Sequence, residues 1–127
     1  MTEIKKAVVS GILISIGGCV LIASTKSGMM WAGAVLFSLG LFSICEYGFN
    51  LYTGKVGYIA EHFRDVKYIG LVVLILVVNL LTTFLMGILV SLCLPDIAEG
   101  ARASYAAKLG AEPQKWLLSS VLCGLLM

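Results

Sequence analysis

The chain has 127 residues, of which 60% are hydrophobic and 13% charged, and its mean hydropathy is +1.02. A soluble domain is about 45–50% apolar and about 25% charged, so the composition indicates an integral membrane protein built of helices. The net charge of +2 gives no reason to expect a nucleic-acid partner. The four cysteines form no CxxC pair, so we expect them to pack as small buried hydrophobes rather than as disulfides or zinc ligands.

The first apolar run, residues 7–24, predicts a transmembrane helix. It follows Lys5 and Lys6 and is longer than the apolar region of a typical signal peptide, so we expect it to stay in place. Small residues let helix backbones approach closely in lipid. This run therefore predicts close packing on a neighbouring helix or protomer, and local flexibility at Gly17 and Gly18 is the alternative.

The second run, residues 29–60, is broken at residues 48–54, between Gly48 and Gly54. Non-helical backbone at membrane depth is tolerated only where it is buried in protein or lines a cavity. Half-helices that meet at such a break can build a solute site. We therefore expect the break to form the wall of a pore.

Three polar residues inside or beside the apolar runs need an explanation. Glu46 directly precedes the break; intramembrane carboxylates are functional candidates, but Glu46 can also lie near the interface and pair with Lys55. Asn79 lies near the middle of the third run, residues 69–94, where interhelical hydrogen bonding is the commoner role than ligand binding. His62 is expected to be a solvated loop residue.

Pro95 ends the third run and opens a polar segment in which we expect a short helix around residues 101–109. The partial fourth run, residues 116–127, is too short to cross a bilayer, which needs about 20 apolar residues. Lys and Arg number five on one side (Lys5, Lys6, Lys55, Arg64, Lys67) and four on the other (Lys26, Arg102, Lys108, Lys115). The positive-inside rule then favours a multi-pass protein of the plasma (inner) membrane with a cytoplasmic N-terminus.

Four stretches in order, residues 7–24, 37–41 (FSLGL), 48–54 (GFNLYTG) and 107–124, resemble the first half of the formate/nitrite transporter family. The resemblance implies an aquaporin-like half with a broken second helix. It also implies a homopentamer whose protomers each hold a pore for small monovalent anions such as formate, nitrite or hydrosulfide. No cofactor is implied, and an enzyme is not expected because no nucleophile–base pair or metal cluster is apparent.

The resemblance assigns six residues to the substrate path: Phe37, Leu41, Leu51, Tyr52, Thr53 and Lys108. The phenylalanine would line the outer constriction, and the two leucines with the tyrosine would line the inner one. The threonine would hydrogen-bond toward the pore centre, and the lysine would attract anions to the outer vestibule. Three polar residues, Glu46, Asn50 and Asn79, are further candidates for the pore or the helix break.

The resemblance covers half of a protomer. Family protomers have six helices arranged as an inverted repeat, and their second half carries a central histidine that no residue here supplies. In the third run, Val78 stands before Asn79 where the family often has glycine. We therefore expect a channel that needs oligomerisation or a second half, passive or proton-coupled; the alternative is a truncated, non-conducting membrane interaction protein of the same family.

Overall fold

The computed structural model describes residues 2–62, 64–110 and 112–126, with the side chains of 123–126 left out of the description. The described residues form helices and turns and contain no strand. The helices in chain order are α1 (Glu3–Lys26), α2 (Met30–Glu46), α3 (Tyr52–Val56), a 3-10 turn (Gly57–Ile59), α4 (Val66–Cys93), α5 (Pro95–Leu109) and α6 (Pro113–Leu126).

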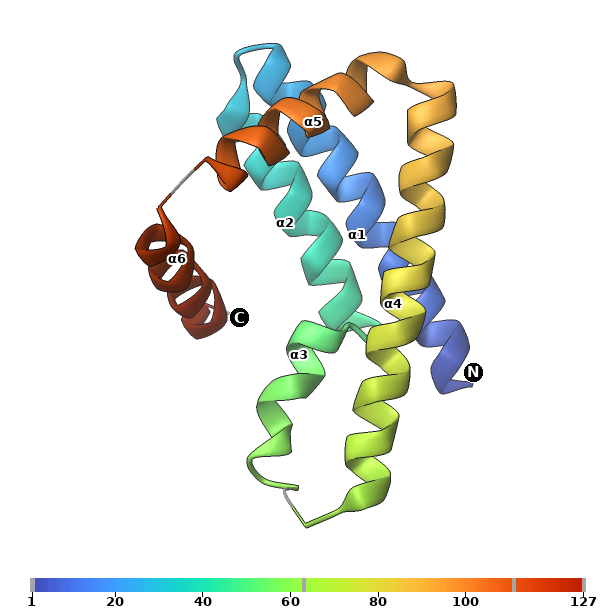
Figure 1. The fold of residues 1–127 in the computed structure, drawn as a ribbon. Coiled ribbons are helices and arrows are strands. Elements are labelled where there is room, and N and C mark those ends of the chain that lie inside the picture. The colour runs from blue at the N-terminus through green and yellow to red at the C-terminus, as the bar shows by residue number, and fades with distance from the viewer. Residues whose placement is uncertain (1, 63, 111, 127) are drawn as a thin grey trace.

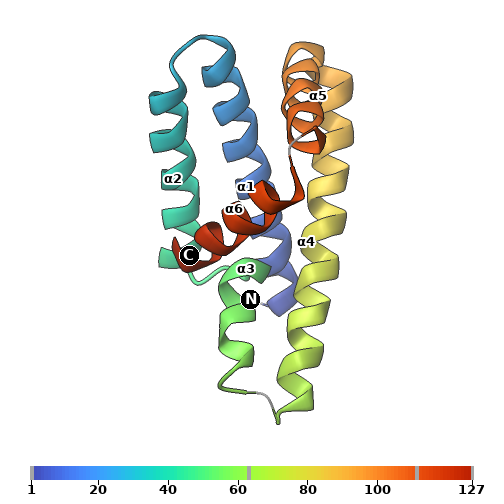
Figure 2. The same cartoon turned by 60° about the vertical axis from the view of Figure 1, so that its left-hand side comes forward.

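The three long helices form a layer in which α1 lies between α2 and α4 (Figures 1 and 2). Small residues of α1 allow this close approach. A Cβ atom on Gly17 would lie 2.9 Å from Cδ2 of Phe37 on α2, and one on Gly11 would lie 2.9 Å from Cβ of Thr82 on α4. The predicted close packing of the first helix is therefore confirmed at these two positions. Gly18 differs, because nothing lies within 4 Å of a Cβ placed there.

The first half of α4 extends past the layer and is accompanied by α3 and the 3-10 turn (Figure 1). Asp65 caps α4, since its carboxylate accepts hydrogen bonds from the backbone N–H groups of Lys67 and Tyr68. The Tyr68 hydroxyl donates to the carbonyl oxygen of Lys55 at 3.0 Å, which holds the two segments together. His62 is exposed in the loop before α4, as expected, and stacks on the Tyr68 ring.

The polar segment after α4 is more helical than the sequence predicts, because α5 starts at Pro95 rather than near residue 101. Proline is favoured at the first helical position, where its missing N–H leaves no bond unmade. Lys26, at the end of α1, donates to the carbonyl oxygen of Asp96 at 2.8 Å and fixes α5 across this end of the layer. The α6 helix follows, and its Trp116 donates from Nε1 to the carbonyl oxygen of Lys108 at 2.6 Å.

Little of the apolar surface is buried within the chain. Two helices, α1 and α4, are long and apolar enough to span a membrane, and α2 is a shorter apolar helix. In the most apolar 18 residues of α1 and of α4, only 22% and 17% are buried. The core helix of a soluble protein, in contrast, is mostly buried. The expected burial of the cysteines is wrong for Cys45 and Cys93, which are exposed, while Cys19 is half-buried. The side chain of Cys123 lies outside the described residues.

Candidate functional site

The break in the second helix occupies residues 47–51. Gly48 has a φ of +61°, a conformation that favours glycine, and it turns the chain out of α2. The N–H of Phe49 then reaches back to the carbonyl oxygen of Ile44 at 2.9 Å, which closes the end of α2. The helix resumes at Tyr52, so Gly54 lies within α3 and not in the break, which is shorter than the sequence predicts.

Asn79 of α4 connects the break to the rest of the layer. Its Oδ1 accepts a hydrogen bond from the backbone N–H of Tyr52 at 2.9 Å. Its Nδ2 donates to the carbonyl oxygen of Ala7 at 2.8 Å and faces Oγ of Ser10 at 3.2 Å and the carbonyl oxygen of Asn50 at 3.3 Å. The expected role of Asn79 in interhelical bonding is thus confirmed, and it extends to the broken segment.

Ser10 of α1 completes this cluster. Its hydroxyl lies 2.8 Å from the carbonyl oxygen of Ala7 and 2.6 Å from that of Asn50, and the side chain is fully buried. One hydroxyl proton and two amide protons therefore serve three acceptor oxygens, two backbone carbonyls and Oγ itself. We name Ser10, Asn50, Tyr52 and Asn79 the break cluster.

A second contact joins the break to the first turn of α1. Asn50 is 1% exposed, and its Nδ2 donates to the carboxylate of Glu3 and to the carbonyl oxygen of Glu3. Glu3 is itself exposed and lies 3.9 Å from the Lys6 ammonium group. The sequence predicts Asn50 and Asn79 as candidates, but not Ser10 or Glu3. The signal for Ser10 is its position as a polar residue inside the first apolar run.

The other sequence-predicted residues are dispersed. Leu51 and Tyr52 are half-buried at the break, and Thr53 is exposed in the first turn of α3. Phe37 and Leu41 are half-buried on α2, and the Phe37 ring packs against α1. Lys108 is exposed on α5, and this helix lies at the end of the layer away from α3 (Figure 1).

Glu46 is exposed at the last position of α2. The alternative that Glu46 pairs with Lys55 is wrong. Among the described residues, the structure has a single ion pair, which joins Lys6 and Glu3. The candidate site is therefore the non-helical break itself, whose shape is set by side chains from α1 and α4. No known family model, curated protein or solved structure matches this chain, so any functional conclusion depends on this geometry and on the sequence pattern.

Proposed function

We propose that the chain forms half of a membrane channel for small monovalent anions of weak acids, of the formate, nitrite and hydrosulfide class. In this proposal it is a multi-pass protein of the plasma membrane with a cytoplasmic N-terminus, and it conducts as an oligomer, a pentamer by its resemblance to formate/nitrite transporters. The observation that carries the proposal is the break cluster, in which Asn79 and Ser10 hold non-helical backbone between two apolar helices.

The proposal explains why two backbone groups at the break are bonded to side chains of other helices. A soluble protein can leave a loop to water, but a chain in hydrocarbon must satisfy each backbone group within the protein. The Tyr52 N–H and the Asn50 carbonyl both receive side-chain partners from other helices. Among the described residues, no buried side-chain nitrogen or oxygen lacks a partner. Both features fit a break inside a bilayer.

The mechanism follows from the cost of dehydrating an anion. An isolated ion that enters an apolar constriction loses its hydration at a large free-energy cost. Leu51 and Tyr52, half-buried beside the break, would contribute such a constriction, with the exposed Thr53 hydroxyl next to it. Lys108 would raise the local concentration of anions at the outer end. A weak acid would then cross after taking a proton, in its neutral form.

Flux into proteoliposomes tests this function. Purified chain is reconstituted, and formate entry is followed with an internal pH dye against protein-free liposomes. The Leu51→Trp variant narrows the proposed path and is expected to lower flux to the protein-free level. Its control, Leu39→Trp, makes the same change on the outer face of α2, where Leu39 is 55% exposed, and should keep wild-type flux. Equal flux in the two variants, or no flux from inserted wild-type protein, contradicts the proposal.

One observation favours the second candidate, a non-conducting membrane interaction protein. Large apolar side chains are exposed along both outer helices, among them Trp31 and Phe42 on α2 and Phe84 and Leu92 on α4. Exposed apolar faces of this size mark interaction or membrane surfaces. A chain that cross-links into a defined oligomer in liposomes but passes no formate, nitrite or hydrosulfide would support this alternative over the channel.

A further inference from the structure

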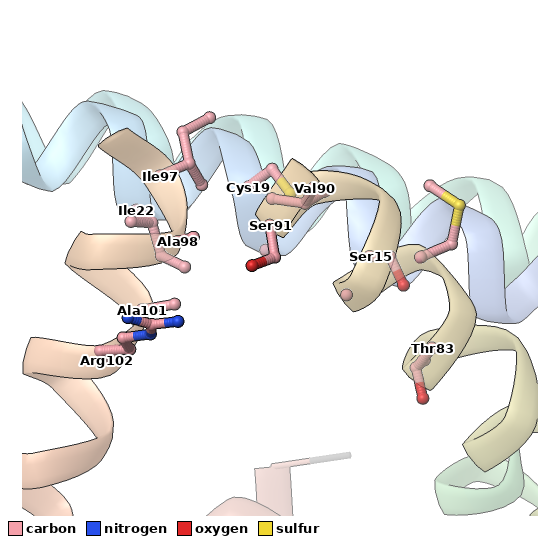
Figure 3. A pocket seen from close by; sticks show the side chains of 13 residues that line it. Ser15, Cys19, Ile22, Thr83, Val90, Ser91, Ile97, Ala98, Ala101 and Arg102 are labelled. Carbon is pink, nitrogen blue, oxygen red and sulfur yellow. The ribbon is translucent and has the colours of Figure 1, made fainter. Parts of the chain in front are cut away.

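A cavity of about 360 Å³ lies between α1, α4 and α5, away from the break cluster (Figure 3). A second hollow of about 520 Å³ runs along α4 from Leu80 to Ser91. The two share Thr83, Gly87 and Ser91, so they form one continuous groove along α4 that ends at α5. We call this the α4 groove.

The interior of the α4 groove offers a ligand mainly apolar contacts, although hydroxyl groups also line it. Ser15 and Thr83 line it, but their hydroxyls donate to carbonyl oxygens of their own helices, at 2.7 Å to Gly11 and 2.9 Å to Asn79. Such back-bonded hydroxyls offer no free donor to a ligand. Nothing lies within 4 Å of a Cβ placed on Gly87, so the groove has real room at its middle.

The end of the groove at α5 is positively charged. Arg102 is the charged residue among the described residues that line the groove. Within the described part of the chain, no carboxylate lies within 4.0 Å of its guanidinium group. Figure 3 shows its guanidinium pointing from α5 into the open space, with the Ser91 oxygen directed into the same space from α4. A guanidinium presents several N–H donors in a planar fork that matches phosphate oxygens.

From Leu80 to Ser91 the groove follows α4 for about 16 Å at 1.5 Å per residue. One leaflet of a bilayer is about 15 Å thick in its hydrocarbon part, half of the whole core. Because α5 is polar and lies across the end of the layer, the charged end falls at the membrane surface and the apolar end near the bilayer centre. The groove therefore has the length and the polarity of one lipid molecule in one leaflet.

We propose that the α4 groove binds an anionic phospholipid, with the phosphate on Arg102 and one acyl chain laid along α4 between Ser91 and Leu80. Basic pockets between membrane helices bind anionic head groups on the cytoplasmic side. The same pairing of guanidinium and phosphate would serve in the outer leaflet, where the proposed orientation places α5. The inference depends on the bilayer placement of the proposed function, but not on anion conduction.

Native mass spectrometry of the full chain in detergent tests the site, with phosphatidylglycerol and phosphatidylcholine as probes. Wild type is expected to retain phosphatidylglycerol in preference to phosphatidylcholine. Arg102→Gln should lose this preference, while Arg64→Gln, the same change in the exposed loop before α4, should keep it. Gly87→Leu fills the groove and should reduce retention of both lipids. Circular dichroism of each variant checks that its helix content is unchanged.

Undiminished preference in Arg102→Gln overturns the proposal, as does an equal loss in Arg64→Gln, which would indicate attraction to any surface cation. A dimer that excludes lipid from the groove also overturns it, since a second copy would then be the occupant. The assay measures no flux. A chain that binds lipid at Arg102 but passes no formate therefore refutes the channel alone, and a conducting chain without lipid preference refutes the lipid site alone.

Discussion

Replacing Asn79 with leucine tests how the break is held. The two side chains have similar size, so the change removes the amide and leaves the packing volume. The single Ser10 hydroxyl proton is then shared between the carbonyl oxygens of Ala7 and Asn50, and the Tyr52 N–H is left without a partner. An unsatisfied buried N–H costs about 1–3 kcal/mol, and an interhelical side-chain bond in a membrane protein contributes about 0.6 kcal/mol on average.

We therefore expect Asn79→Leu to destabilise the break by about 2–3 kcal/mol, mostly through the unpaired Tyr52 N–H. Ser10→Ala should cost less, about 0.6 kcal/mol, because Asn79 still donates to both carbonyl oxygens. Thr82→Val is the matched control on α4, since the Thr82 hydroxyl bonds only to Val78 in its own helix.

Amide hydrogen exchange in detergent, resolved at Tyr52, measures the effect directly. A loss of 2–3 kcal/mol corresponds to roughly 30- to 150-fold faster exchange at that amide. Thr82→Val should leave it unchanged. Tyr52 exchange in Asn79→Leu that equals wild type would refute the reasoning, as would a loss in Thr82→Val as large as that in Asn79→Leu.

Two further predictions concern pairs of glycines. Gly17→Ala should destabilise the layer by about 1–3 kcal/mol through overpacking against α2, whereas Gly18→Ala, with open space around it, should gain up to about 1 kcal/mol of helix propensity. Thermal unfolding followed by circular dichroism compares the two variants. Equal effects on stability would contradict the packing of Gly17 against α2. Gly48→Ala should lower stability by about 1–2 kcal/mol because of the positive φ at this position, while Gly54→Ala, inside α3, should be neutral or stabilising. The same thermal unfolding measurements test both variants. A clear loss of stability in Gly54→Ala would contradict the observed end of the break before α3.

The long helices could be predicted from the sequence because each contains a long uncharged apolar run, although α1 begins at Glu3, before the run that starts at residue 7. The start of α5 differs from the prediction, because Pro95 both ends the third apolar run and opens the next helix. Gly48 correctly predicts where α2 ends, but Gly54 predicts too long a non-helical segment. A glycine signals permitted backbone freedom and does not show that the freedom is used.

The partners of the break could not be predicted, for a physical reason. The Tyr52 N–H is satisfied by a side chain 27 positions later, and Asn79 in turn bonds to Ala7, 72 positions earlier. Local patterns carry no information about such pairs, because only the packing of α1 between α2 and α4 brings them together. The sequence could therefore indicate that Asn79 needs a partner, but not that its partner is the broken segment.

The position of the break cluster along α4 has a consequence for the bilayer placement. The apolar part of α4, from Ile69 to Cys93, is about 36 Å long at 1.5 Å per residue, and Asn79 lies about 15 Å from its first residue. The cluster therefore lies well inside the apolar height of the layer. Asn79 bonds to Ala7, and Glu3 precedes Ala7 by four residues, about 6 Å along α1. The charged first turn of α1, which bonds to Asn50, therefore also lies within the apolar part of α4. Ionisable groups at such depth face the bundle interior or a water-filled cavity, and the exposure of Glu3 favours the cavity.

We therefore expect water to reach the first turn of α1 from the cytoplasmic side, beside α3. Ile4→Cys, in a background without other cysteines, should react with a hydrophilic thiosulfonate added to inside-out vesicles. Ile16→Cys is the control on the same helix. The two isoleucines are 50% and 49% exposed in the chain, so their reactivity differs only through access to water. Ile16 lies about 18 Å farther along α1 and should stay unreactive. An unreactive Ile4→Cys would remove the aqueous entrance from the channel proposal, and reaction only in right-side-out vesicles would reverse the proposed orientation.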